Sequence, residues 1–221
     1  MTPEANKRRA IRPLTLHIFF AVLVFYFAMA APALAAISCE LNYPTSDVVR
    51  LFPDSTSYKS VYFSFSQRGG DTMLHKVEAR LGGAPALYAP LNVPYVLYEV
   101  YKGNRKVGYV HGVNQKGQFG VLEVFVSLDM KGTIKAFYIQ RISGSWGRKF
   151  TSPKFGRQFV GLSLKDFERY DTSSGKGSGK VAAIVNPAPE AQTDFFGVLR
   201  AIKKNLVLMD EFFYAPEKGK Q

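Results

Sequence analysis

Cysteine is nearly absent from this chain of 221 residues, which contains Cys39 and no other. A single cysteine excludes an internal disulfide, a cysteine metal cage and a redox dithiol. Acidic residues are also scarce, since 17 Asp and Glu stand against 29 Lys and Arg, for a formal net charge of +12. Such a charge suits an anionic membrane surface or an acidic redox partner. The sequence has no basic helix and no zinc pattern, so we expect no nucleic-acid partner.

Several function classes lack their motifs. Residues 171–180 are rich in Ser, Gly and Lys, but neither Gly-Lys pair there is followed by Ser or Thr, as a phosphate-binding P-loop requires. His75 and His111 are isolated in the sequence, which favours surface or core roles over metal ligation. No nucleophile, base and orienting group cluster together, so hydrolase chemistry has no support.

A long uncharged run occurs at the N-terminus. A basic segment at 7–12 is followed by residues 18–37, which carry no charge and are long enough to cross a bilayer core of roughly 30 Å as a helix. Ala33 and Ala35 form a signal-peptidase pattern, which favours cleavage after Ala35. An uncleaved anchor is the second interpretation. Either one places the protein at the outer face of the cytoplasmic membrane or in the periplasm, and we assign residues 1–36 to a signal peptide or membrane anchor.

Cys39 allows a third interpretation of the N-terminal region, in which a lipid anchors the protein. Ala36-Ile37-Ser38-Cys39 loosely resembles a lipoprotein box, which makes Cys39 a lipidation candidate. Ordinary cleavage after Ala35 is favoured over it, because the box begins with Ala and not Leu. An unpaired thiol near a new terminus stays open as well.

Helical periodicity appears in four places. Thr45 or Ser46 can cap a short helix that ends near Leu51, and Asp71 can begin a second that ends at Gly82. A weak helix start lies at 163–166. The strongest pattern covers 195–209, where apolar residues recur at three- and four-residue steps. We place its basic residues, Arg200, Lys203 and Lys204, on the solvent side.

Strand patterns fill the middle of the chain, and they predict strands at 95–101, 106–113, 119–128 and 133–140. Asp129 and Gly132 are typical of the turn between the last two. The sequence therefore predicts an α+β fold, an antiparallel sheet or half-barrel with packed helices, preceded by the N-terminal signal or anchor helix. We divide the remainder into an N-terminal helical extension at 37–94, a main domain at 95–210 and a flexible C-terminal tail at 211–221.

Four motifs follow one another in the main domain. They are Gly-Gln-Phe-Gly-Val-Leu at 117–122, Ser-Leu-Asp-Met-Lys-Gly-Thr-Ile at 127–134, Ser-Gly-Ser-Trp-Gly at 143–147 and Phe-Gly-Arg-Gln-Phe-Val-Gly at 155–161. In this order they resemble the FMN-binding domain of membrane-anchored subunits of Rnf-type complexes and sodium-pumping NADH:quinone reductases. The resemblance covers residues 95–206. It implies bound FMN and electron transfer with membrane redox partner proteins, as a component of a larger system and not as a stand-alone enzyme.

The attachment motif departs from that family. Its flavinylated members have Ser-Gly-Ala-Thr before the C-terminal helix, and the Thr carries FMN through a phosphodiester bond. This chain has Glu190-Ala191-Gln192-Thr193, so we expect any bound FMN to be noncovalent. A helix start at Thr193 favours an anion, whereas Glu190 and Asp194 would repel one. Thr193 or Asp194 can equally be a plain N-cap.

The resemblance implies a set of cofactor-binding residues: Phe119, Gly120, Trp146, Gly147, Gln158, Gln192 and Thr193. Trp146 can cover one face of an isoalloxazine or be an ordinary buried aromatic residue. Phe119 also suits a role in core packing, and Gln158 also suits a hydrogen bond to the backbone. The alternative function is a flavin-free binding or assembly module on the same fold.

Overall fold

The computed structural model describes residues 39–82 and 93–218. The predicted signal peptide or anchor at 1–36 lies outside the described residues, as does its cleavage site. Within the described ranges, no helix combines the length and the apolar character that crossing a bilayer requires.

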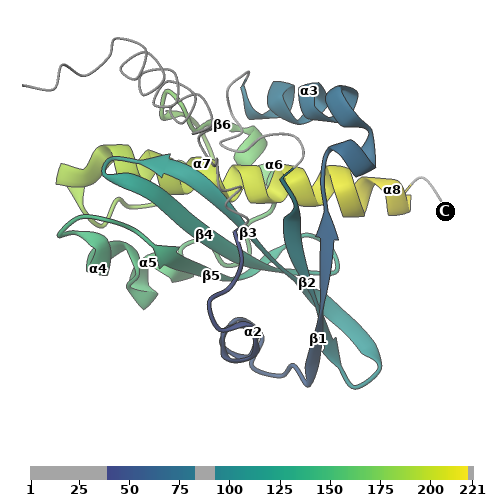
Figure 1. Cartoon of the computed structure of the whole chain (residues 1–221). Coiled ribbons are helices and arrows are strands. Elements are labelled where there is room, and N and C mark those ends of the chain that lie inside the picture. The colour runs from purple at the N-terminus through teal and green to yellow at the C-terminus, as the bar shows by residue number, and fades with distance from the viewer. Residues whose placement is uncertain (1–38, 83–92, 219–221) are drawn as a thin grey trace, which may run out of the picture. The chain divides into compact units, whose positions relative to one another are not determined.

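An antiparallel sheet forms the centre of the domain (Figure 1). Its five strands lie in the order of the sequence: β1 (Ser57–Phe63), β2 (Tyr95–Lys102), β3 (Arg105–Gly117), β4 (Gly120–Asp129) and β5 (Ile134–Arg141). Together with the helices described below, the sheet confirms the predicted α+β fold. The four predicted strands correspond to β2–β5, within a few residues at their ends.

The turn between β4 and β5 forms as its residues predict. The Asp129 carboxylate accepts hydrogen bonds from the backbone N–H groups of Lys131 and Thr133, at 2.8 and 2.9 Å. Gly132 supplies a positive φ of 79°, which costs glycine little. The Asp and the Gly therefore reverse the chain with local interactions alone.

The edge strand β1 was not predicted. It lies inside 37–94, where we expected a helical extension, and it pairs with β2 from Ser57↔Tyr101 to Phe63↔Tyr95. Along β1, burial alternates only weakly, and Phe63 alone is fully buried. A strand with this pattern is specified by pairing with its neighbour and not by its own periodicity. The two predicted helices of the region do form, as α2 (Pro44–Leu51) and α3 (Gly70–Leu81), and Gly82 ends α3 with a φ of 99°.

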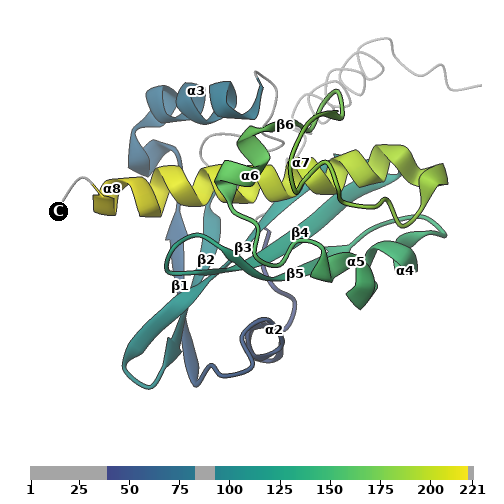
Figure 2. The same cartoon turned by 180° about the vertical axis from the view of Figure 1, so that it is seen from behind.

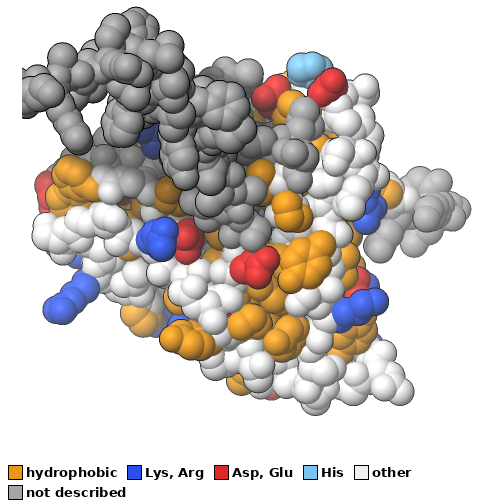
Figure 3. Space-filling view, viewed as in Figure 1, with side chains coloured by type: hydrophobic (Ala, Val, Ile, Leu, Met, Phe, Trp, Pro, Cys, Tyr) orange, Lys and Arg blue, Asp and Glu red, His pale blue; other side chains and the backbone are white. Residues whose placement is uncertain are grey.

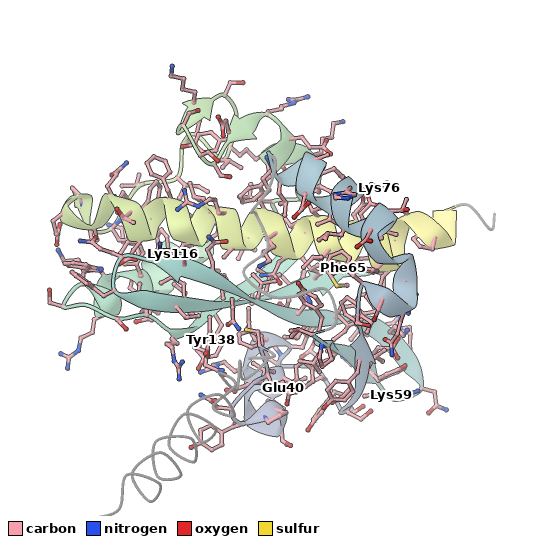
Figure 4. All side chains as sticks on the ribbon, turned by 45° about the horizontal axis from the view of Figure 1, so that its top comes forward. Glu40, Lys59, Phe65, Lys76, Lys116 and Tyr138 are labelled. Carbon is pink, nitrogen blue, oxygen red and sulfur yellow. The ribbon has the colours of Figure 1, made fainter. Side chains whose placement is uncertain are left out.

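Two hydrophobic cores lie on opposite faces of the sheet. The larger one is covered by α7 (Gln192–Met209), the long helix that the sequence predicts, with α3 beside it (Figures 1 and 2). The smaller one lies under α2 and includes Cys39, Val48, Tyr98 and Phe125. Figure 4 shows Phe65 between α3 and the sheet, and Tyr138 on the side where Glu40 and α2 lie.

Lys204 corrects the predicted solvent side of α7. Its side chain is 2% exposed, and Nζ donates a hydrogen bond to the carbonyl of Asn114 in β3 at 3.0 Å. Burial lowers the pKa of this ammonium to about 8. Because α7 lies along β3, a position that faces solvent in an isolated helix is covered here by the sheet.

The helix also continues past residue 210, where we expected a flexible tail. A π-helical turn at Asp210–Tyr214 leads into α8 (Ala215–Lys218). Phe212 contacts Phe63 and Phe65, with ring centroids 4.9 and 5.2 Å apart. Phe212 and Tyr214 therefore belong to the core, with Phe213 packed against it.

Short elements connect β5 to α7: α4 (Gly147–Phe150), α5 (Pro153–Arg157), α6 (Leu164–Glu168), β6 (Tyr170–Asp171), β7 (Lys176–Gly177) and the 3₁₀ turn η2 (Pro189–Ala191). A further 3₁₀ turn, η1 (Ser66–Arg68), precedes α3. The weak helix start predicted at 163–166 is confirmed by a capping box in α6, where Ser163 N and Oγ both donate to Asp166 at 2.9 Å.

Candidate functional site

Three segments that are distant in the sequence meet at the start of α7. Asp194 joins them, because its Oδ1 accepts a hydrogen bond from Gln118 N at 2.7 Å and its Oδ2 accepts one from Trp146 Nε1 at 2.6 Å. Asp194 is 1% exposed. A Cβ on Gly117 would stand 2.7 Å from Asp194 Oδ1, so this approach requires glycine. The carboxylate thus connects the β3–β4 turn, the 143–147 turn and α7.

A pair of aromatic rings, the exposed Phe119 and the partly buried Trp146, lies beside this carboxylate. Phe119 is 59% exposed, and its ring centroid is 5.5 Å from that of Trp146, with 31° between the planes. Gly144 has a φ of 111°, and a Cβ there would come within 2.8 Å of the indole. The turn therefore needs this glycine where the indole lies against it. The exposed ring of Phe119 offers an aromatic face that a planar ligand could contact.

The first turn of α7 has no side-chain cap. The helix begins at Gln192, after Ala191 at the N-cap position, so neither Thr193 nor Asp194 is the N-cap that we predicted. Gln192 and Thr193 are exposed. Backbone N–H groups at a helix start favour an anion, and here the buried Asp194 supplies a negative charge within the same turn.

Charged side chains surround this helix start. Glu190, one of the two acids that we expected to repel an anion, forms an ion pair with Lys149 at 2.6 Å. The Lys149 ammonium lowers the pKa of Glu190. Lys149 lies in α4, which begins at the buried Gly147, directly after Trp146. The 143–147 turn therefore places a lysine beside the start of α7.

Two of the remaining predicted residues, Gln158 and Gln192, form hydrogen bonds within the protein. Gln158 bonds to Val185 in both directions, with Val185 N donating to its Oε1 at 2.8 Å and its Nε2 donating to Val185 O at 3.2 Å. This is the backbone hydrogen bond that we weighed for Gln158. Gln192 Oε1 accepts a hydrogen bond from Asn186 Nδ2 at 3.0 Å. Gly120 has a φ of 130°, and a Cβ on it would be 3.9 Å from Ser143 Oγ.

The structure therefore brings Phe119, Gly120 and Trp146 together, with Thr193 at the adjoining helix start. Sequence reasoning missed the central role of Asp194, which we considered only as a cap or a repelling charge. Its partner Trp146 is 48 positions away, and no local pattern predicts a hydrogen bond over that separation.

Cys39, the lipidation candidate, is buried in the smaller core with 7% exposure. Burial, aided by the charge of Glu123, raises the pKa of its thiol. A lipid attached to this sulfur would have to leave the core, so the folded arrangement disfavours lipidation at Cys39.

No protein-family model matches the sequence, and no curated protein matches it either. Among solved structures, the crystal structure of NqrC from Shewanella oneidensis is similar, with a TM-score of 0.48 and 14% sequence identity. That similarity covers 90% of this chain and 97% of that one.

Proposed function

We propose that the domain binds FMN noncovalently at the start of α7 and acts as a component of electron transfer. The observation that carries this proposal is the aromatic pair of the exposed Phe119 and the partly buried Trp146, held beside a helix start that has no side-chain cap. An aromatic face suits an isoalloxazine ring, and the backbone N–H groups of a helix start suit a phosphate. The ordered motifs at 117–161 support the same ligand.

The residues at the start of α7 suit noncovalent binding of the isoalloxazine ring better than they suit a phosphodiester bond between FMN and Thr193. Asp194 is one residue away from Thr193 and already accepts two hydrogen bonds as a carboxylate. Lys149 balances the charge of Glu190 in an ion pair. The preceding residue, Arg148, is exposed. When bound, the flavin would supply one- or two-electron chemistry, while this chain orients it and sets its electrostatic surroundings.

Flavin absorption tests the proposal directly. Protein purified from its exported fraction should show the visible flavin bands, and protein prepared without flavin should take up added FMN in a titration. Riboflavin, which lacks the phosphate, should bind more weakly if the helix start contributes. A protein that holds no flavin and takes up no FMN would overturn the proposal.

A matched pair of variants locates the ring. Phe119→Ala should weaken FMN binding about threefold to tenfold, as expected for one aromatic contact. Tyr62→Ala removes an aromatic side chain that is 57% exposed on β1, at a similar exposure, and should leave FMN binding unchanged. Equal effects in both variants would place the ring elsewhere.

Intact mass tests the noncovalent link. After denaturation, the mass should equal that of the processed polypeptide alone. An added FMN phosphodiester mass that disappears in Thr193→Val would show that the link is covalent.

A flavin-free binding or assembly module is the second candidate. One observation favours it: the Asp194 carboxylate already occupies the first turn of α7 and takes up the indole N–H of Trp146. The FMN titration separates the two candidates, because a flavin-free module would not bind FMN.

The proposed setting is the outer face of the cytoplasmic membrane, with membrane redox proteins and anionic lipid as partners. The charged and uncharged segments of the N-terminus support export. On the face in Figure 3, hydrophobic side chains gather in the lower part, near α2, and the exposed ones of the domain include Tyr43, Val49 and Tyr62.

A further inference from the structure

A long part of the chain carries cations and no acidic residue. Residues 130–165 contain eight Lys and Arg side chains and no Asp or Glu. This part includes β5, the 143–147 turn, α4 and α5. A stretch of this composition gives the surface around it a positive potential.

Buried aromatic rings orient the cations of α4 and α5. Phe155 packs against Phe150 and Phe159, with ring centroids 5.4 and 5.1 Å apart, and all three rings belong to the larger core. Three cations at the same two helices are exposed: Arg148, Lys154 and Arg157. The helices therefore have an apolar side toward the core and a basic side toward solvent, and the ring packing holds that basic side in place.

The exposed cations of this part have no acidic partner. Four of them form no ion pair with any residue that the structure describes: Lys135, Arg148, Lys154 and Arg157. Arg141 and Lys149 instead balance Glu123 and Glu190, in ion pairs of 3.4 and 2.6 Å. The four free cations therefore stay available to an anionic partner.

Exposed aliphatic side chains lie among these cations. Val160 is 48% exposed and lines the same groove as Lys135 and Arg157. Val185 is 68% exposed, and its backbone bonds to Gln158, the residue after Arg157. We call the four free cations and the two valines the α4–α5 surface. Figures 1 and 2 show α4 and α5 together on one side of α7, with β6 on the other.

We propose that the α4–α5 surface lies on anionic lipid head groups. Each Lys or Arg near such a surface is attracted to it, and exposed aliphatic side chains can enter the interface between head groups and acyl chains. The inference rests on the membrane setting of the proposed function, in which the uncharged run at 18–37 would keep the domain close to a bilayer. It does not require bound flavin.

The composition of this surface favours lipid over an acidic protein. Protein interfaces usually have aromatic residues at a centre that excludes water, whereas the exposed apolar side chains of the α4–α5 surface are valines. Long Lys and Arg side chains without a fixed partner can follow mobile head groups. A partner protein would instead present its charges at fixed positions.

This orientation brings the candidate site to the membrane. α4 begins directly after Trp146, so a lipid surface on α4 lies beside the pair of Phe119 and Trp146. A ligand held at that pair would then be close to proteins embedded in the same membrane. The α4–α5 surface would therefore set the direction in which the domain meets its redox partners.

Energy transfer from Trp146, the only tryptophan, tests this orientation. The full chain, free of flavin, is placed in liposomes that contain dansyl-labelled phosphatidylethanolamine as the acceptor. We expect stronger transfer in phosphatidylglycerol liposomes than in phosphatidylcholine liposomes. High salt should reduce the transfer in phosphatidylglycerol to the level in phosphatidylcholine, because it screens the attraction.

Charge reversal locates the contact. The double variant Lys154→Glu with Arg157→Glu should lose the extra transfer in phosphatidylglycerol, and the neutral variant Lys154→Gln with Arg157→Gln should lose part of it. A matched double variant, Arg169→Glu with Lys176→Glu, reverses two exposed cations at β6 and β7. Because β6 lies on the other side of α7, this variant should keep the extra transfer.

Several outcomes would contradict the proposal. Equal transfer in the two lipids would overturn it, as would the same loss in both charge-reversed variants. Transfer that ignores lipid charge, together with poly-glutamate binding that Lys154→Glu with Arg157→Glu abolishes, would also overturn it and assign the surface to an acidic protein. FMN titration of the same preparations is independent of this readout, so failure of flavin binding and failure of lipid docking are separate results.

Discussion

Asp194 shows how one residue can organise a site that no local pattern reveals. Its two carboxylate oxygens accept hydrogen bonds from segments that precede it by 76 and 48 positions. Because the side chain is buried, each of these bonds forms where water does not compete. The arrangement of Phe119 and Trp146 therefore depends on this carboxylate.

Replacing that carboxylate by an amide tests its role. In Asp194→Asn, one oxygen becomes an NH₂ group that cannot accept from Trp146 or Gln118, which leaves a buried donor facing a donor. We expect a loss of about 1–3 kcal/mol in the free energy of unfolding and a shift in the emission of Trp146, the only tryptophan. Asp71→Asn, at an exposed site in α3, is the matched control. Unchanged stability and emission in Asp194→Asn would contradict this role.

His111 is a second residue whose environment sets its behaviour. It is fully buried, with ring centroids of Phe63 and Tyr95 at 5.8 and 6.2 Å. Neither ring nitrogen has a hydrogen-bond partner of normal geometry among the described residues, and the same holds for Oδ1 of the neighbouring Asn205. Burial lowers the pKa of His111 from 6.5 to about 4.

This lowered pKa predicts acid sensitivity. The unfolded chain binds a proton on His111 at higher pH than the folded chain does, so protonation favours unfolding. Stability should therefore fall as the pH drops from about 6.5 toward 4. His111→Leu, with a side chain of similar volume, should flatten this part of the pH profile of unfolding. His75→Gln, at an exposed histidine, should keep it, and equal slopes in the wild type and His111→Leu would exclude His111 as the cause.

Among the elements, the C-terminal helix has the largest structural consequence. The π-helical turn at 210–214 places Phe212 in the core and lets Arg80 of α3 reach Asp210 at 2.8 Å. Tyr214 donates a hydrogen bond from its hydroxyl group to Asp129 O at 2.9 Å. One turn of helix thus connects α3, the β4–β5 turn and the edge strand β1.

Truncating one side chain of this turn tests its contribution. Phe212 is 2% exposed, so Phe212→Ala should lower the free energy of unfolding by about 3–5 kcal/mol through a cavity beside Phe63 and Phe65. Denaturant unfolding measures this loss. Phe119→Ala, which shortens an exposed phenylalanine, should cost less than about 1 kcal/mol. A flexible tail, as the sequence suggested, would instead make both variants equally mild.

At the scale of the whole molecule, the proposed membrane setting rests on the net charge and on the uncharged run near the N-terminus. The long uncharged run supports an anchor helix directly, whereas a lone lipid on Cys39 would hold only marginally. The buried thiol adds a second reason to favour the helix.

Cell fractionation tests this setting. We expect the protein to remain with the membranes through washes at low and high salt, and Cys39→Ser to remain there as well. Sequencing the mature N-terminus identifies the processing. A protein that begins at Ala36 and washes freely into the soluble periplasmic fraction at low salt would exclude both anchors and leave a diffusible carrier.

The strongest features of the fold could be predicted from the sequence because they are local. Strands β2–β5 follow runs of alternating or continuous apolar residues, and Asp129 with Gly132 makes its turn through bonds within five residues. The apolar face of α7 repeats at helical spacing. β1 and the turn at 210–214 could not be predicted in this way, because Phe63 and Phe212 pack against residues distant in the sequence.

The same difference between local and long-range interactions separates the predicted features of the site from the unpredicted ones. The sequence by itself determined the α+β fold, the ordered motifs and the candidate residues Phe119, Trp146 and Thr193. Tertiary structure alone decided that Asp194 would join three segments and that Lys204 would be buried against β3. The physical reason is range: periodicity and turn chemistry act between neighbours in the chain, whereas burial and charge compensation depend on which distant segments come into contact.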